Sequence, residues 1–146
     1  MNFNTKTYQQ LTKEELYNIL QLRAEVFVVE QECVYQDIDN KDQKALHILG
    51  YKNNELIAYA RIFKPNDYFE FASIGRVVVA QKERNHKYGY HLMEAAIMAI
   101  NIHFKVYTIA ISAQEHLKKF YTNLGFTQIG KGYLEDGIPH IYMLRK

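Results

Sequence analysis

The sequence has few cysteines and prolines, and its charges nearly cancel. It contains one cysteine, Cys33, so a disulfide within the chain is excluded. The formal net charge is only +2, without a long lysine and arginine run, which argues against binding to nucleic acid. No apolar run approaches the roughly 18 residues of a membrane-spanning helix. Residues 1–10 are polar where a secretory signal would be apolar. These absences predict a cytoplasmic protein without a membrane partner.

Several kinds of catalytic site are also missing. The six histidines are scattered, and neither a His-Glu-x-x-His pattern nor paired cysteines occur, so we expect no metal. Cys33 lies in an acidic stretch, which disfavours a thiolate nucleophile. The Gly-x-x-x-x-Gly-Lys-[Ser/Thr] pattern of phosphate-binding loops is absent. The basic turn at 84–89 has one glycine where a dinucleotide-binding fingerprint needs three, so a Rossmann domain is excluded.

The length and composition indicate one globular domain over residues 1–146. A chain of 146 residues suits a single hydrophobic core. Hydrophobic residues make up 48% and charged residues 23%, as in folded rather than disordered proteins. We find no internal repeat, low-complexity tract or linker.

The apolar pattern predicts elements in the order β-α-β-β-β-α-β-α-β-β. Such mixed connections predict an α/β fold, with one mixed (α+β) sheet and helices on both faces. One helix is expected after Thr12, one after the basic turn, and one over Leu117 to Leu124. The expected strands cover residues 3–9, 47–51, 55–63, 69–80, 106–111, 126–129 and 138–144.

Short local patterns support this order. Thr12 to Glu15 and Ser112 to Glu115 both read as capping boxes that begin helices. Asn53-Asn54 suits a two-residue hairpin turn, because asparagine tolerates positive φ. Gly75 is a candidate for a β-bulge, and Asp136-Gly137 for the turn of the last hairpin.

The polar segment 30–44 is acidic and has two interpretations. A charged run is most often a solvated loop, which is the favoured reading. A long ordered loop is also often functional, and this one could form a rim that attracts a cationic amine. Arg23 on the first predicted helix could pair internally with an acid such as Glu30 or face a substrate cleft, and Arg61 and Arg76 on predicted strands offer the same two alternatives. We expect internal pairing for all three.

The most informative stretch joins a β-branched strand to an apolar helix through a basic turn. Val77-Val78-Val79 is followed by Arg84 and Lys87, and Gly89 lets the backbone approach a ligand closely. The first amides of a helix have no partners within it, and its dipole favours negative charge there. The stretch therefore predicts a phosphate-binding site.

This stretch resembles the acetyl-CoA-binding segment of GCN5-related N-acetyltransferases (GNAT), which reads Arg/Gln-x-x-Gly-x-Gly/Ala. Here it is Arg84-Asn85-His86-Lys87-Tyr88-Gly89, with lysine at the first glycine position. A second motif of the superfamily lies at Gln114 to Phe126, where Tyr121, Gly125 and Phe126 match. The chain resembles the ElaA-like group of this superfamily more closely, through the segments 22–31, 35–39, 47–50 and 135–140.

The resemblance implies a fold in which the strand containing Val77 parts from the strand at 106–111, and acetyl-CoA binds in the gap. It implies no metal. The residues expected to contact acetyl-CoA are Val77, Val78, Val79, Arg84, Asn85, His86, Lys87, Tyr88, Gly89, Tyr90, Gln114 and Tyr121. Tyr121 is also the expected general acid, because tyrosine keeps its proton at neutral pH. Periodicity alone instead places Tyr121 in an apolar stripe with Leu117 and Leu124.

The general base and the acceptor site are less well marked. Glu70 could act as base through a water, or His140 could serve instead; each is also explained as an ordinary polar surface residue. The suggested acceptor contacts are Glu30, Tyr35, Asp37 and His140. The resemblance thus implies an N-acetyltransferase that transfers acetyl from acetyl-CoA to a primary amine, as a monomer or homodimer. The alternative is a non-catalytic acyl-CoA-binding or interaction module on the same fold.

Overall fold

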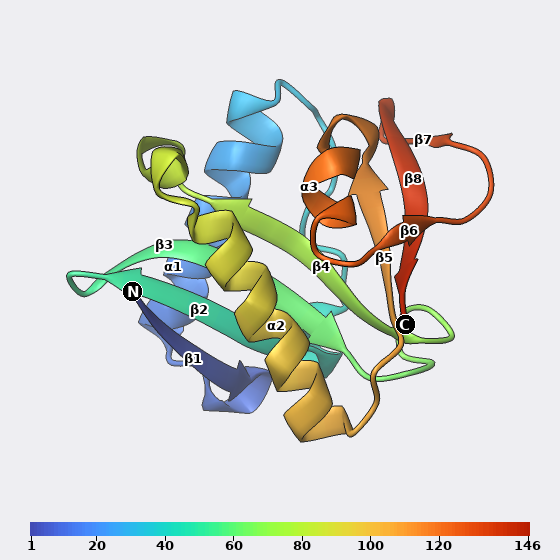
Figure 1. The fold of residues 1–146 in the computed structure, drawn as a ribbon. Coiled ribbons are helices and arrows are strands. Elements are labelled where there is room, and N and C mark those ends of the chain that lie inside the picture. The colour runs from blue at the N-terminus through green and yellow to red at the C-terminus, as the bar shows by residue number, and fades with distance from the viewer.

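The strands form one eight-stranded mixed sheet (Figure 1). The structure is a computed structural model that describes residues 1–146. The strand order is β1-β2-β3-β4-β5-β8-β6, and β7 pairs with β8. Only β4 and β5 pair in parallel. The strands are β1 (Asn2–Thr7), β2 (Leu46–Lys52), β3 (Glu55–Phe63), β4 (Ala72–Val79), β5 (Ile109–Gln114), β6 (Thr127–Gln128), β7 (Tyr133–Glu135) and β8 (Ile138–Arg145).

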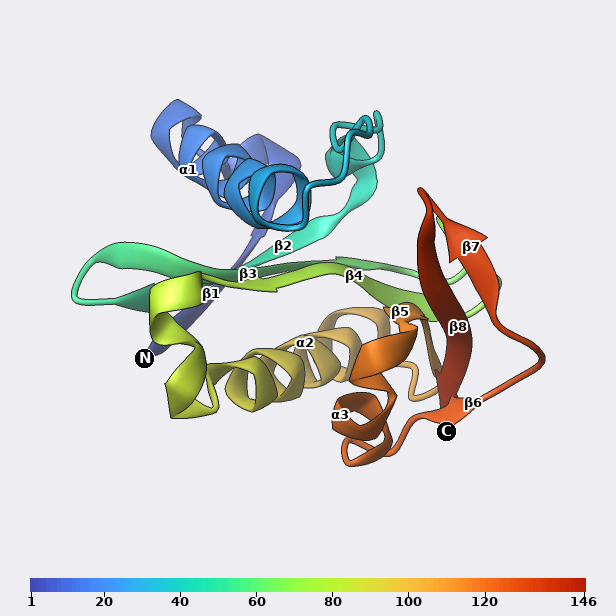
Figure 2. The ribbon, with the colours of Figure 1, turned by 90° about the horizontal axis from the view of Figure 1, so that it is seen from above.

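Helices cover both faces of the sheet, as expected. Figure 2 shows α1 (Lys13–Arg23) on one face, and α2 (Tyr88–Phe104) and α3 (Lys118–Thr122) on the other. The larger apolar core lies between the sheet and α2, and a smaller one lies under α1. None of the helices combines the length and apolarity that a bilayer crossing requires.

The predicted parting of two strands is confirmed. β4 and β5 pair only through Ala72 with Ile109 and Ser73 with Ala110. Beyond these two pairs the strands diverge, as Figure 1 shows on the right of the molecule. The edge of β4 that faces β5 therefore has no strand partner along Ile74–Val79.

A bulge interrupts β4 where the strands begin to part. Tyr59 pairs with Val78 and Arg61 pairs with Gly75, so β4 has one residue more than β3 over this interval. The expectation of a bulge at Gly75 is thus confirmed in position. However, the left-handed backbone belongs to Arg76, with φ of 50°. A left-handed conformation costs a non-glycine residue about 1–3 kcal/mol, so neighbouring contacts must hold it.

Two local predictions from sequence are confirmed. The Thr12 hydroxyl accepts from the Glu15 amide at 3.0 Å, and the Glu15 carboxylate accepts from the Thr12 amide at 2.8 Å. Asn53 and Asn54 form the β2–β3 turn with φ of 52° and 64°. Asn54 and its neighbour can adopt these angles because their short side chains tolerate the left-handed region.

Other element boundaries differ from the predictions. Ser112 to Glu115 is not a capping box, because β5 runs to Gln114 and the following helical turn has no side-chain cap. β4 begins at Ala72 rather than residue 69, since residues 64–71 form an irregular turn. α1 ends at Arg23, and the chain continues as a wider π-type helix over Ala24–Glu30. The Asp136-Gly137 turn joins β8 to β7, a strand that was not predicted.

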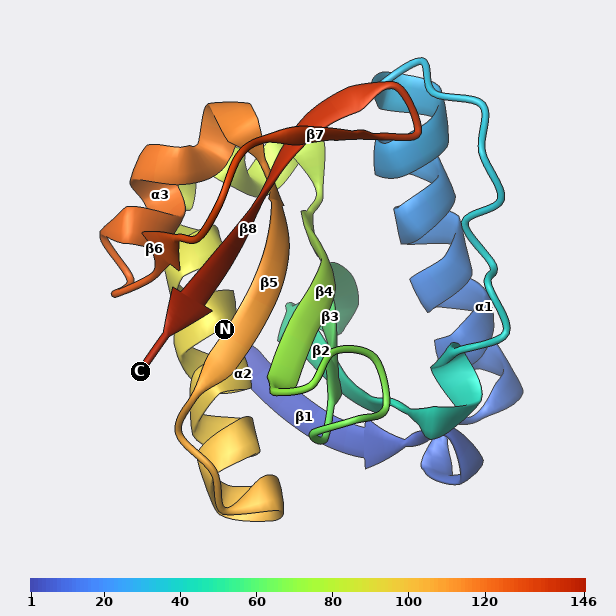
Figure 3. The ribbon, with the colours of Figure 1, turned by 90° about the vertical axis from the view of Figure 1, so that its right-hand side faces the viewer.

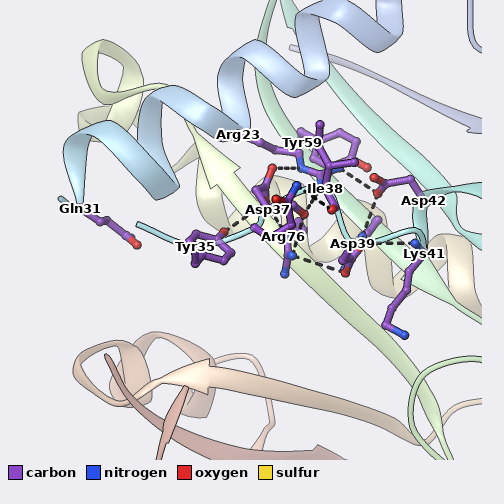
Figure 4. Close-up of polar contacts among 12 residues, drawn as sticks. Arg23, Gln31, Tyr35, Asp37, Ile38, Asp39, Lys41, Asp42, Tyr59 and Arg76 are labelled. Carbon is purple, nitrogen blue, oxygen red and sulfur yellow. Dashed lines mark hydrogen bonds and ion pairs between the residues drawn. The ribbon is translucent and has the colours of Figure 1, made fainter. Parts of the chain in front are cut away.

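The acidic segment after the π-type helix forms a buried ionic cluster with three arginines. We call Arg23, Arg61, Arg76, Asp37, Asp39 and Asp42 the Arg–Asp cluster. Figure 4 shows Arg23 and Arg76 approaching Asp37 from opposite sides, and their Nε atoms donate to its carboxylate at 2.9 and 2.7 Å. Asp42 accepts from both Arg23 and Arg61 at 2.8 Å, and Arg61 also binds Asp39.

The cluster corrects the interpretation of the acidic segment. Internal pairing of the three arginines is confirmed, but their partners are aspartates and not Glu30. Three of the segment's carboxylates are therefore engaged inside the protein, so they form neither a solvated loop nor a free acidic rim. His47 lies beside them, and its ring nitrogens contact the Tyr59 hydroxyl and the Asp42 carbonyl oxygen at 2.6 and 2.9 Å.

We expect Asp42→Asn to lower the free energy of unfolding by about 3–5 kcal/mol, because it leaves two buried arginines with an unmatched charge. Urea denaturation followed by circular dichroism measures this. Glu55→Gln is the matched control: the Glu55–Lys82 pair is exposed, so little change is expected. Equal effects of the two substitutions would contradict a structural role for the cluster.

Stability should also fall in acid. Burial would raise the pKa of Asp39, but Arg61 and Arg76 outweigh burial and lower it to about 2; the pKa of Asp42 is lowered against burial by Arg23 and Arg61. Burial lowers the pKa of His47 from 6.5. The unfolded state therefore binds more protons, so the unfolding free energy should decline below about pH 6.5 and decline further below about pH 4. Urea denaturation at a series of pH values tests this; a flat profile would contradict it.

Candidate functional site

A large cleft opens where β4 and β5 part. Its volume is about 780 Å³, and half of its lining residues are hydrophobic. One wall consists of β4 and the π-type helix with the segment that follows it. The opposite wall consists of β5, α3 and the β7–β8 turn. We call the part near residues 84–89 the turn end, and the part near the β7–β8 turn the hairpin end.

The turn end is built to receive an anion. Lys87 adopts a left-handed conformation with φ of 59° and ends the short 3-10 helix Gln81–His86 immediately before α2. No side chain caps the N-terminus of α2. Its first amides and the positive end of its dipole are thus available to a ligand. Lys87 adds an exposed ammonium group that makes no ion pair within the protein.

Arg84 holds the turn against the wall formed by β4 and the π-type helix. Its guanidinium donates to both carboxylate oxygens of Glu30, with Nη2 at 2.9 Å, and its Nε donates to the Val79 carbonyl at 3.1 Å. Glu30 was expected to contact the acceptor, but here its carboxylate is engaged by Arg84. Because a bidentate arginine–carboxylate contact has a defined geometry, this pair connects the π-type helix to the turn.

Backbone groups of β4 form the floor between the two ends. Val77, Val78 and Val79 all line the cleft, and the edge of β4 that faces β5 is unpaired there. Buried backbone N–H and C=O groups need partners. A ligand with amide groups can therefore bind along this edge as an additional strand would, and an amide of β4 can donate to a carbonyl that lies beside it.

Tyr121 reaches the cleft from α3. Its side chain is buried against the rings of Phe120 and Phe126, at centroid distances of 4.9 and 6.1 Å, and it also lines the cleft. Its hydroxyl forms no hydrogen bond with another protein group. Burial raises the pKa of Tyr121, so the hydroxyl keeps its proton at neutral pH. Tyr121 is therefore both a core residue and a potential proton donor in the cleft.

The hairpin end carries a network of polar side chains. The Glu135 carboxylate accepts from the Ser112 hydroxyl at 3.2 Å and lies 3.4 Å from His140 Nε2. The Ser112 hydroxyl also bonds to the hydroxyl of Tyr133, whose ring stacks on the His140 ring. Tyr35 lines the wall across the cleft, where its hydroxyl donates to Asp37.

Two contacts join the walls at the hairpin end. The Gln114 side-chain amide donates to the Gln31 side-chain oxygen at 3.3 Å, and Cys33 Sγ lies 3.4 Å from the carbonyl oxygen of Asp136. Figure 3 shows the β7–β8 hairpin reaching over to the end of the helical segment that follows α1. The cleft is therefore bridged on this side, although β4 and β5 themselves are apart.

Most residues expected from the sequence meet in this cleft. All of the expected cofactor contacts line it except His86 and Tyr88. Among the expected acceptor contacts, Glu30, Tyr35 and His140 line it, whereas Asp37 is buried in the Arg–Asp cluster.

Glu70 is placed differently. It lies in an exposed bend before β4 rather than on the strand, and it does not line the cleft. Its position therefore gives no support to a role as general base. Ser112 was expected only to cap a helix and Glu135 had no expected role, yet both line the cleft. Glu135 lies in a segment that resembles the ElaA-like group, but nothing local distinguishes it from a turn-flanking acid.

Comparisons with known proteins identify the family and the fold. The family model described as "Acetyltransferase (GNAT) domain" matches residues 4–146. Protein ElaA of Escherichia coli strain K12 is 46% identical over 141 residues, covering 95% of this chain and 92% of ElaA. The crystal structure of E. coli ElaA has a TM-score of 0.92 at 44% identity, covering 99% of both chains. An acyl-CoA N-acyltransferase from Pseudomonas aeruginosa has a TM-score of 0.93 at 39% identity, covering both chains fully. The chain therefore belongs to the GNAT acetyltransferase family, in its ElaA-like group, whose fold implies a coenzyme A thioester as co-substrate.

Proposed function

We propose that this protein is an N-acetyltransferase that transfers the acetyl group of acetyl-CoA to a primary amine by direct attack within a ternary complex. The observation that carries the proposal is the continuous cleft. It runs from the uncapped start of α2, along the unpaired edge of β4, to the hydroxyl of Tyr121. Each of these three parts suits a different portion of acetyl-CoA.

The chain's own residues would hold acetyl-CoA in the following way. The first turn of α2 and Lys87 bind the pyrophosphate through amide hydrogens, helix dipole and ammonium charge. The unpaired edge of β4 bonds to the amides of the pantetheine arm. An amide near Val77–Val79 donates to the thioester oxygen and stabilises the negative charge that develops there during attack. Positioning of two substrates in one cleft itself contributes several kcal/mol.

Tyr121 completes the reaction. When the amine nitrogen has bonded to the carbonyl carbon, the carbon–sulfur bond breaks and the electron pair leaves with sulfur. The Tyr121 hydroxyl gives its proton to this thiolate, for which it is suited because burial keeps the phenol protonated. The rival reading is a module that binds acyl-CoA without catalysis, and it shares the cleft but not the need for Tyr121.

We expect Lys87→Gln to weaken CoA binding about 5- to 30-fold, since it removes one charged contact to phosphate. Isothermal titration calorimetry measures this. Pantetheine lacks the pyrophosphate, so its affinity should not change. Lys13→Gln, on the exposed surface of α1, serves as the control. Equal loss for CoA and pantetheine would place the pyrophosphate elsewhere.

We expect Tyr121→Phe to lower kcat by about 100-fold or more while leaving the KM for acetyl-CoA unchanged, because it removes only a proton donor. Steady-state acetylation of a panel of amines, followed by release of free thiol, measures both constants. Tyr107→Phe, at an exposed position, is the control. Tight CoA binding without transfer to any amine in the unmodified protein would favour the non-catalytic reading.

A further inference from the structure

The hairpin end contains a carboxylate, that of Glu135, which is held in place but can still accept further hydrogen bonds. Glu135 receives one hydrogen bond from Ser112 and lies beside His140, yet 45% of its side chain remains exposed and it lines the cleft. A carboxylate has about four lone-pair positions, so Glu135 can accept further hydrogen bonds from a ligand. Its orientation is set by Ser112, which is itself bonded to Tyr133.

His140 is held beside this carboxylate in a defined orientation. Its Nδ1 lies 2.7 Å from the carbonyl oxygen of Ile138, which can only accept, so Nδ1 carries a hydrogen. In the neutral ring the other nitrogen, Nε2, is then the one with a free lone pair. Nε2 is the nitrogen that faces Glu135. When the ring is neutral, a group bound to the Glu135 carboxylate is thus next to a nitrogen that can accept a proton.

The remaining charges at the hairpin end favour a cation. Arg76 is the only arginine that lines this end, and Asp37 and Asp39 already neutralise it. Glu135 and Asp136 have no arginine or lysine partner, and His140 is the only side chain beside Glu135 that can carry a positive charge. An uncompensated carboxylate attracts ammonium groups and disfavours anions.

From this arrangement we infer that Glu135 is the acceptor-binding residue of the cleft. It would hold a protonated aliphatic amine as an ammonium–carboxylate pair, beside His140. The inference rests on the proposed acetyl transfer, and it adds the class of acceptor, an alkylammonium group, and the residue that selects it. Glu135 in this role contacts the substrate directly, whereas Ser112 and Tyr133 position Glu135.

All protons and electron pairs of the acetyl transfer are accounted for. His140 Nε2 takes one proton from the ammonium group, which frees the nitrogen lone pair, and Glu135 holds the imidazolium charge that results. The free amine forms a bond to the thioester carbon, and the carbon–sulfur bond then breaks. Sulfur receives a proton from Tyr121, and the second proton lost by nitrogen returns to the Tyr121 oxygen through water. An alkylammonium ion and acetyl-CoA thus yield the N-alkylacetamide, CoA thiol and one proton.

Two aromatic amines of similar shape test this inference. Benzylamine is protonated at neutral pH and aniline is not, so only benzylamine can pair with Glu135. We expect benzylamine to bind the protein–CoA complex, as measured by calorimetry, and Glu135→Gln to weaken that binding about tenfold or more. Aniline binding should be weak and unaffected by the substitution. Glu94→Gln, on the exposed face of α2, is the control.

Kinetics give an independent readout. If the unmodified protein acetylates benzylamine, Glu135→Gln should raise the KM for benzylamine and leave the KM for acetyl-CoA unchanged. Equal binding of benzylamine by the unmodified protein and Glu135→Gln, or a preference for aniline, would overturn the inference. Binding that depends on Glu135 without any acetylation would support this cation site and instead reject the proposed transferase function.

Discussion

The cleft of this protein exists because the pairing between β4 and β5 ends after a few residues. β4 and β5 share only two residue pairs before they separate. Unpaired backbone within a sheet is costly unless another group satisfies it, so most sheets extend their ladders as far as the strands allow. Here the unpaired edge forms the floor of a cleft of about 780 Å³, in which a ligand can supply the missing hydrogen bonds. The strands themselves thus form the binding surface, rather than serving only as its support.

The Arg–Asp cluster explains how one wall of this cleft keeps its shape. Arg76 has a left-handed backbone in the bulge of β4, a conformation that costs free energy. Its side chain is held by the carboxylate and the carbonyl oxygen of Asp37. Asp37 is in turn held by Arg23 of α1. The cluster therefore connects α1, the acidic segment and the β4 bulge, and its three positive and three negative charges cancel, which makes their burial tolerable.

The two ends of the cleft have opposite electrostatic character. The turn end has an unpaired lysine and the positive end of a helix dipole. The hairpin end has Glu135 and Asp136 without a strong cationic partner. A donor that carries phosphates and an acceptor that carries an ammonium group would each be drawn to the matching end, and their reactive groups would meet over the bulge of β4. The contacts of Gln31 with Gln114 and of Cys33 with Asp136 connect the two walls at the hairpin end.

The sequence by itself determined the order of the elements other than β7 and the location of the turn that begins α2. Hydrophobic periodicity, the Thr12 capping box and the paired asparagines act over a few residues, so they can be read without a fold. The resemblance of residues 84–89 and 114–126 to a known family predicted that two strands separate and that Tyr121 lies at the site between them. Only the tertiary structure decided the partners of the charged side chains. The aspartates at 37, 39 and 42 read as a solvated run because their arginines come from α1, β3 and β4, between 14 and 39 residues away in the chain. Likewise, Glu135 became a candidate acceptor site only because β8 pairs with β5, which brings Ser112 to the β7–β8 hairpin, where His140 already lies beside the Glu135 carboxylate. Side-chain partnerships of this kind depend on strand pairing over long separations, and no local pattern of residues records them.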